Sequence, residues 1–298
     1  MSLDGPDLRG AYTALITPFS ENGSPDISAL RALVRRQLDA GIDGLVPCGT
    51  TGEAATMTPD EQLRVIETVA DEVDGAVPVI AGTGTNDTAK TIDHTRRVSE
   101  IDGVGAALVV TPYYNKPGQP ELLRHYRAVA DGGNLPVVLY NVPGRTGVSL
   151  EADTVARLAE HEAIIGIKEA SADMVLDTAI AANTPDEFTL FSGDDFTTFP
   201  LMAVGGQGCI SVVANLDPQD MTRMCEAALD NDYETARQLH ASIQPLARAL
   251  FRKTNPIPVK TAAHLLGWCG PTLRGPLYEP DDDFKEELDN ALHAYGLS

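Results

Sequence analysis

The stretch AIIGIKEAS, residues 163–171, has the composition of a buried β-strand with a lysine at its end. Ile164, Ile165 and Ile167 suit a strand that is covered on both faces. Lys168 is unexpected there, because the chain has only 6 lysines against 16 arginines and because desolvating an ammonium group costs several kcal/mol. Two interpretations are open. The side chain reaches out to water from the strand end, or its burial favours the uncharged amine, which attacks carbonyl groups and forms a Schiff base.

Outward from this strand, the same pattern repeats along the chain: an apolar, β-branched run followed by an amphipathic helical pattern. The other seven runs lie at residues 11–19, 44–49, 77–82, 106–114, 135–143, 188–195 and 208–215. The helical patterns begin near Asp26 and at Thr58-Pro59, a cap residue followed by a helix-starting proline, and continue at residues 88–100, 121–132, 151–161, 174–183, 199–205 and 217–231. Eight βα units over about 230 residues predict an α/β fold, a TIM (β/α)8 barrel rather than an open doubly wound sheet.

The strand signal stops after residue 231. Three helical patterns follow, at residues 233–251, 257–267 and 283–296. We therefore expect a catalytic barrel over residues 1–231 and a small C-terminal helical domain over residues 232–298.

Composition and charge exclude several classes of protein. The chain has 43 acidic and 22 basic residues, a net charge of −21, and such a field repels nucleic acid and anionic membranes. No apolar run approaches the roughly 18 residues of a membrane span, and the N-terminus has no signal-peptide pattern. We expect a cytoplasmic protein that binds neither nucleic acid nor membrane. Dense carboxylates and scarce lysine also predict a halophilic protein, adapted to high salt.

The sequence offers no pattern for a metal or nucleotide cofactor. The four cysteines are scattered, and the six histidines show no zinc-binding spacing. The GTG at residues 82–84 lacks the third glycine of a dinucleotide fingerprint, and no phosphate-binding P-loop occurs.

Polar residues and glycine-containing turns stand at the C-terminal ends of several predicted strands. A TIM barrel carries its active site at these ends. These residues and turns are GTTGE (49–53), TPYYNKP (111–117), YNVPGRTG (140–147), Lys168 and SGDD (192–195). Backbone N–H groups of the GTTGE turn can bind an anion, and the Thr50 hydroxyl can relay a proton. Tyr140 ends the strand beside that of Lys168 and can pass a proton to a bound carbonyl. Each of these features also has a purely structural interpretation. GTTGE could be a simple turn at a strand end, and Tyr140 could be a packing residue at the barrel rim.

Together with GCISVVAN (208–215) and NPIPVK (255–260), these motifs resemble the dihydrodipicolinate synthase and N-acetylneuraminate lyase superfamily in order and spacing. The resemblance covers essentially the whole chain. TPYYN and NPIPVK resemble the dihydrodipicolinate synthase branch in particular.

The resemblance implies a pyruvate-dependent enzyme. Lys168 would form a Schiff base with the ketone of pyruvate, while Thr50 and Thr51 hold its carboxylate. Tyr140, Thr50 and Tyr114 would form a proton relay, with Tyr114 reaching in from a neighbouring subunit of a homotetramer built as a dimer of dimers. The covalent Schiff base would replace any cofactor.

The second substrate implied is L-aspartate 4-semialdehyde, which leads to 4-hydroxy-tetrahydrodipicolinate in lysine and diaminopimelate biosynthesis. Arg145 would hold its carboxylate as a bidentate clamp, and Gly193 and the Ile210 backbone would line the pocket. A sugar-acid aldolase of the same superfamily, such as a 2-keto-3-deoxygluconate aldolase, is the alternative. It would share the pyruvate residues but would not need the Arg145 clamp. A catalytically idle barrel would have lost the lysine, the tyrosines or the GTTGE turn, and all are present.

Many members of the resembled family are inhibited by lysine at a subunit interface. This chain keeps Asn86 and Tyr113, but Pro59 and Gln62 stand where such members carry histidines. Lys90 stands where they carry an acidic residue. A cation facing a cationic ligand reverses the sign of the interaction, so we predict an enzyme that is insensitive to lysine.

Overall fold

The computed structural model describes residues 3, 5 and 8–297 of the chain. Eight strands form one parallel sheet in the order β2-β1-β8-β7-β6-β5-β4-β3. The strands are β1 (Gly10–Ala14), β2 (Gly44–Val46), β3 (Ile80–Gly82), β4 (Ala106–Val110), β5 (Val137–Asn141), β6 (Ile164–Glu169), β7 (Thr189–Ser192) and β8 (Gly208–Ser211). Each lies within one of the eight predicted runs or overlaps it.

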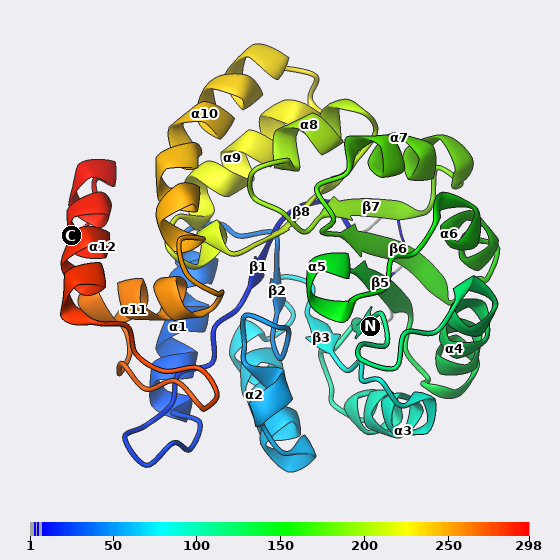
Figure 1. Cartoon of the computed structure of the whole chain (residues 1–298), viewed down its shortest axis with the longest axis horizontal. Helices are drawn as coiled ribbons and strands as arrows, with labels where there is room; N and C mark the ends of the chain where they lie inside the picture. The colour runs from blue at the N-terminus through cyan, green and yellow to red at the C-terminus, as the bar shows by residue number, and fades with distance from the viewer. Residues whose placement is uncertain (1–2, 4, 6–7, 298) are drawn as a thin grey trace.

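Backbone contacts between β2 and the β3 segment close the sheet into a barrel. Leu45 forms a parallel bridge with Val79, and its N–H donates to the Pro78 carbonyl at 3.0 Å. The Gly82 N–H donates to the Pro47 carbonyl, also at 3.0 Å. Figure 1 shows the resulting ring of strands. The predicted TIM barrel is confirmed.

Helices surround this ring, and the last three lie to one side of it (Figure 1). They are α1 (Ile27–Asp39), α2 (Pro59–Val73), α3 (Thr88–Val98), α4 (Gln119–Gly132), α5 (Pro143–Thr146), α6 (Ala152–Ala159), α7 (Met174–Asn183), α8 (Thr198–Ala203), α9 (Pro218–Leu229), α10 (Tyr233–Leu250), α11 (Ile257–Leu265) and α12 (Asp282–Tyr295), with single 3-10 turns at Ala54–Thr56 and Val213–Asn215. Helix α10 packs against both α9 and α12. The division expected between residues 231 and 232 falls between α9 and α10 and stays a prediction.

Local chemistry explains where the first two helices begin. The Asp26 side chain accepts a hydrogen bond from the Ala29 N–H and caps α1. Thr58 and Glu61 form a reciprocal capping box, with Pro59 at the first helical position of α2. Both helix starts match the sequence prediction. In the described part of the chain, no helix has the length and apolar character needed to cross a membrane.

Two apolar cores are separated by the sheet. The inner core fills the barrel and includes Tyr12, Val138, Tyr140, Phe191 and Ile210. The outer core lies between the strands and the helices. Because side chains alternate between the two faces of a strand, the register of each strand decides which residues reach the interior of the barrel.

Candidate active site

Lys168 lies inside the barrel. It pairs in register with Tyr140 of β5 and Phe191 of β7, both members of the inner core, whereas the preceding Ile167 belongs to the outer core. The Lys168 residue is 6% exposed, and its Nζ lies 4.5 Å from the centre of the Tyr140 ring. The side chain therefore does not reach out to water from the strand end, and the amine lies beside the tyrosine expected to exchange protons with it.

Gly193 makes room for this lysine. A Cβ atom at Gly193 would lie 2.8 Å from Lys168 Cε and 2.7 Å from Ala170 Cβ, so the lysine side chain and the segment at Ala170 would have to shift to admit it. The Gly193 N–H donates to the Glu169 carbonyl at 2.6 Å, which fixes the turn after β7 beside β6. Ile210 lies on β8, fully buried in the inner core with Tyr140.

The GTTGE turn follows β2 and presents free backbone donors. In the described part of the chain, the N–H groups of Thr50 and Thr51 have no hydrogen-bond acceptor, and the Glu53 N–H donates to the Thr50 carbonyl at 3.1 Å. Cys48 and Glu53, on either side, adopt left-handed backbone angles with φ of 56° and 55°. Unpaired N–H groups in a tight turn favour an anion such as a carboxylate.

Glu53 fixes this turn to the C-terminal part of the chain. Its carboxylate accepts a hydrogen bond from Lys260 Nζ at 2.5 Å, and both residues are fully buried. The second carboxylate oxygen accepts from the Arg274 N–H at 2.9 Å. Burial lowers the pKa of Lys260, and the neighbouring Glu53 charge opposes that shift.

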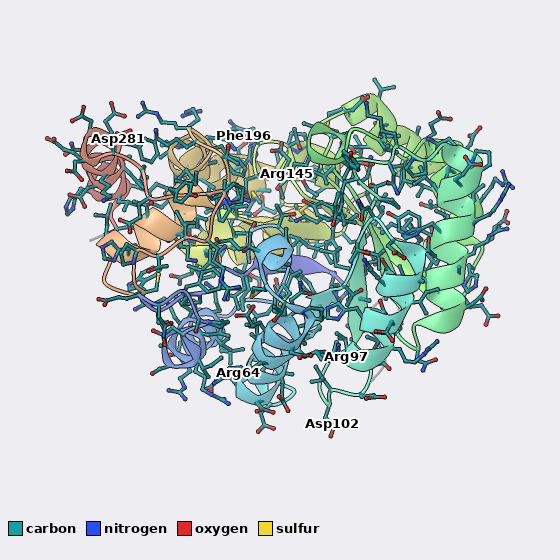
Figure 2. The ribbon with its side chains drawn as sticks, turned by 60° about the horizontal axis from the view of Figure 1, so that its bottom comes forward. Arg64, Arg97, Asp102, Arg145, Phe196 and Asp281 are labelled. Atoms are coloured by element: carbon teal, nitrogen blue, oxygen red, sulfur yellow. The ribbon has the colours of Figure 1, made fainter. Side chains whose placement is uncertain are left out.

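Arg145 lies in α5, a short helix after β5 that the sequence analysis did not predict. Its guanidinium Nη2 donates to the Asn255 carbonyl at 3.1 Å, and the rest of the side chain is exposed. In Figure 2 the labelled Arg145 lies on the opposite side of the view from Asp102, which belongs to the loop before β4. Arg145 therefore belongs to the carboxyl ends of the strands, where TIM barrels carry their active sites.

A cavity of about 860 Å³ lies beside some of these groups; Thr51, Lys168, Gly193 and Ile210 are not among the residues that line it. Thr50, Tyr140, Arg145 and Asn255 line it, and Tyr140 connects it to Lys168. Tyr114 lies outside the lining of this cavity and is 88% exposed in the single chain, with a left-handed φ of 73°.

The same cavity extends between α2 and α3. Pro59, Gln62, Lys90 and Tyr113 line this part. The Lys90 side chain is 78% exposed, and its Nζ lies 3.9 Å from an Asp87 carboxylate oxygen. Lys90 therefore exposes its ammonium group to solvent in this part of the cavity.

Two buried carboxylates brace the strands around Lys168. Glu169 faces the opposite way from Lys168, and its carboxylate accepts from Asn141 Nδ2 at 2.7 Å, while burial raises its pKa. Asp195, from the SGDD motif, accepts from Ser211 Oγ at 2.5 Å and from the Val212 N–H at 3.1 Å. Burial raises the pKa of Asp195 to about 6. Its contacts fix the loop that follows Ile210. Among the residues described, no cluster of three or more His, Cys, Asp or Glu side chains is arranged to hold a metal ion.

Asn255 and Lys260 are the residues whose roles sequence reasoning missed. The NPIPVK motif served there only as a mark of resemblance. The available signal was the one that singled out Lys168: a lysine, scarce in this chain, set among apolar residues.

Comparison with known proteins agrees with this geometry. A sequence model of the dihydrodipicolinate synthetase family matches residues 7–295. The chain belongs to this family. The 4-hydroxy-tetrahydrodipicolinate synthase of Pelobacter propionicus is 48% identical over 290 residues, which cover 97% of this chain and 99% of the relative. The synthase of Methanospirillum hungatei is 45% identical over 291 residues, with the same coverage.

Solved structures of family members have the same fold. Dihydrodipicolinate synthase from Aquifex aeolicus superposes with a TM-score of 0.95 at 40% identity, over 97% of this chain and 99% of that one. The chloride-inhibited synthase from Acinetobacter baumannii, complexed with pyruvate, gives a TM-score of 0.95 at 41% identity with the same coverage. A further match at 41% identity and a TM-score of 0.95, covering 99% of both chains, is described as the first monomeric variant of the enzyme.

Proposed function

We propose that this chain condenses pyruvate with L-aspartate 4-semialdehyde to give 4-hydroxy-tetrahydrodipicolinate, a lyase reaction in lysine and diaminopimelate biosynthesis. The names of the full-length relatives support the overall reaction. The contact between the buried Lys168 and Tyr140 is the observation that carries the mechanism.

In the first half of the reaction, Lys168 Nζ adds to the ketone carbon of pyruvate, and water leaves to give an imine. The imine withdraws electrons, so the methyl carbon loses a proton and an enamine forms. The Tyr140 phenol and the Thr50 hydroxyl move these protons, and Tyr114 of the partner subunit completes the relay. The N–H groups of Thr50 and Thr51 hold the pyruvate carboxylate.

In the second half, the enamine carbon attacks the aldehyde carbon, and the aldehyde oxygen takes up a proton. The amino group of the substrate then attacks the imine carbon and displaces Lys168, which closes the ring and regenerates the amine. Arg145 holds the substrate carboxylate with its planar, permanently charged guanidinium. Gly193 and the Ile210 backbone line the pyruvate end. The imine serves as the electron sink, so the proposed reaction uses no cofactor.

The assembly we propose is a homotetramer, a dimer of dimers, in which Tyr114 enters the site of a neighbouring copy. The left-handed backbone and high exposure of Tyr114 support this role, because a non-glycine residue is held in that conformation at an energetic cost. Light scattering should give four times the chain mass of 31.7 kDa. A fully active monomer would overturn the shared relay.

The alternative is a sugar-acid aldolase, which would pair pyruvate with a polyhydroxy aldehyde. The exposed Arg145 guanidinium at the cavity favours an aldehyde that carries a carboxylate. The test is to assay pyruvate consumption with aspartate semialdehyde and with glyceraldehyde in parallel. We expect the larger kcat/KM with aspartate semialdehyde, and a preference for glyceraldehyde would reject the proposed function.

A further inference from the structure

Strand β6 carries one residue more than β5 at the point where the two strands pair. Val137 pairs with Ile164, but the next residue of β5, Val138, pairs with Gly166. Ile165 and Gly166 therefore both stand opposite Val138, which is the arrangement of a β-bulge. The pairing after the bulge is shifted by one residue from the pairing before it.

This bulge decides which way Lys168 points. In a regular strand, side chains two residues apart lie on the same face. Ile165 belongs to the inner core and Ile167 to the outer core, so the alternation of β6 shifts by one residue between them. Without that shift, Ile167 would face the interior of the barrel and Lys168 would face the surrounding helices.

A buried amide–carboxylate pair follows the bulge. Asn141 comes directly after Tyr140, Glu169 comes directly after Lys168, and Asn141 and Glu169 pair in register. Asn141 Nδ2 donates to Glu169 Oε2 at 2.7 Å, and both residues are buried. If the pairing before the bulge continued unshifted, Asn141 would stand opposite Lys168 instead. The hydrogen bond between the two side chains therefore belongs to the bulged register.

The remaining acceptors of this pair are also satisfied. Glu169 Oε1 accepts from the Ser171 N–H at 2.6 Å, and Asn141 Oδ1 accepts from the Leu150 N–H at 2.9 Å. Burial raises the pKa of Glu169, and its hydrogen bonds with Asn141 and Ser171 oppose that shift. A buried carboxylate is costly compared with an apolar side chain, but its hydrogen bonds are satisfied in only one arrangement. Such a pair can specify a register that apolar contacts alone leave open.

We propose that Asn141 and Glu169 are positioning residues, whose hydrogen bond holds the bulged register and so keeps Lys168 inside the barrel opposite Tyr140. This inference rests on the proposed function and adds to it two residues that act through Lys168 rather than by touching a substrate. The effect on the reaction is expected to be large, because a displacement of about 1 Å at a reacting group can lower the rate 100-fold.

The test exchanges the amide and the carboxylate. Glu169→Gln brings two N–H donors together, and Asn141→Asp brings two carboxylates together. In the double variant Asn141→Asp/Glu169→Gln, the new glutamine amide donates to the new aspartate, while the N–H groups of Ser171 and Leu150 keep their acceptors. The double variant therefore restores the hydrogen bond with donor and acceptor reversed.

A matched control lies on α10. Glu234 accepts from Gln238 Nε2 at 2.6 Å in an exposed amide–carboxylate pair, so Glu234→Gln alters the same kind of bond away from β5 and β6. The measurements are kcat and KM for pyruvate at saturating aspartate semialdehyde, the rate constant of borohydride trapping with pyruvate, and the melting temperature. Activity is measured well below the melting temperature of every variant, so that loss of folded protein does not enter the comparison.

We expect Glu169→Gln and Asn141→Asp each to lower kcat and the trapping rate constant by about 10- to 100-fold. The KM for pyruvate should change by less than about threefold, because the turn proposed to hold its carboxylate lies at the end of another strand. The double variant should recover to within about threefold of the wild type. Glu234→Gln should match the wild type.

Single variants with wild-type kcat but a lower melting temperature would overturn the inference, because the pair would then contribute to stability alone. A double variant as impaired as the single ones would overturn it as well, since the restored bond would not restore the site. If a single variant does not fold, Asn141→Ser makes the same comparison. A wild-type protein that does not trap pyruvate would reject the proposed function itself, whereas an active wild type with unaffected variants would reject only this inference.

Discussion

Glu53 and Lys260, 207 positions apart in the chain, form a buried ion pair with 2.5 Å between Oε1 and Nζ. Glu53 ends the turn that presents Thr50 and Thr51, and Lys260 lies in α11. The C-terminal helices therefore contact the site directly, through the ion pair between Lys260 of α11 and Glu53. They fix the geometry of the turn that we propose binds pyruvate.

Breaking one half of this pair should be worse than removing both halves. Lys260→Met leaves an uncompensated buried carboxylate, and we expect the free energy of unfolding to fall by about 3–5 kcal/mol. The double variant Glu53→Gln/Lys260→Met should lose less than Lys260→Met alone, since no buried charge remains. Urea unfolding measures both. The losses of unfolding free energy are also measured for Glu53→Gln and Lys260→Met singly. If these two losses simply add in the double variant, Glu53 and Lys260 do not act as a pair.

Arg145→Ala should impair the use of aspartate semialdehyde far more than Schiff-base formation with pyruvate. The two carboxylates have separate holders in the proposed site, and losing a bidentate, charged hydrogen-bond partner should lower kcat/KM for the aldehyde at least 100-fold. Arg124→Ala, on the exposed face of α4, controls for loss of positive charge. A drop in pyruvate trapping as steep as the drop in turnover would contradict this division of roles.

Salt should stabilise the protein. With a net charge of −21, self-repulsion falls as the Debye length shrinks from ~10 Å at 0.1 M salt to ~3 Å at 1 M. We therefore expect the melting temperature to rise from dilute buffer to molar KCl. Sucrose at matched osmolality controls for effects of an uncharged solute. An unchanged melting temperature across the KCl series would reject the high-salt interpretation.

Lysine should not inhibit the enzyme below millimolar concentration. The exposed Lys90 ammonium lines the cavity between α2 and α3, and it would repel a cationic ligand there. Lys90→Glu should lower the concentration of lysine that gives half-inhibition, because a carboxylate at this position would attract the cationic ligand that the ammonium group repels. Steady-state rates at increasing lysine measure both proteins. Half-inhibition of the unmodified enzyme at micromolar lysine would show that Lys90 does not govern the site.

The repeating strand and helix patterns were enough to predict the barrel, because buried parallel strands and amphipathic helices leave local signals in the sequence. The sequence also predicted that Lys168 and Tyr140 lie close together. They stand near the ends of consecutive strands, and strands that follow one another in sequence lie side by side in a TIM barrel. The environment of Gly193 could be read only from the structure, where its missing Cβ leaves space for Lys168.

Contacts between distant parts of the chain were beyond sequence reasoning. Nothing local in NPIPVK indicates that Asn255 meets Thr51 and Arg145, or that Lys260 meets Glu53. Such pairs depend on how α11 docks beside the barrel. Periodicity predicts that a helix has an apolar face, but it does not specify which strand end that face will cover.

Lys168 is the residue that we propose forms a Schiff base with pyruvate. Borohydride reduction in the presence of pyruvate, followed by digestion and mass spectrometry, tests this assignment directly. Lys260, the other buried lysine, serves as an internal control because it is paired with Glu53. We expect a single reduced adduct on Lys168, and no adduct on a folded Lys168→Ala variant. An adduct on another lysine, or none on the wild-type protein, would contradict it.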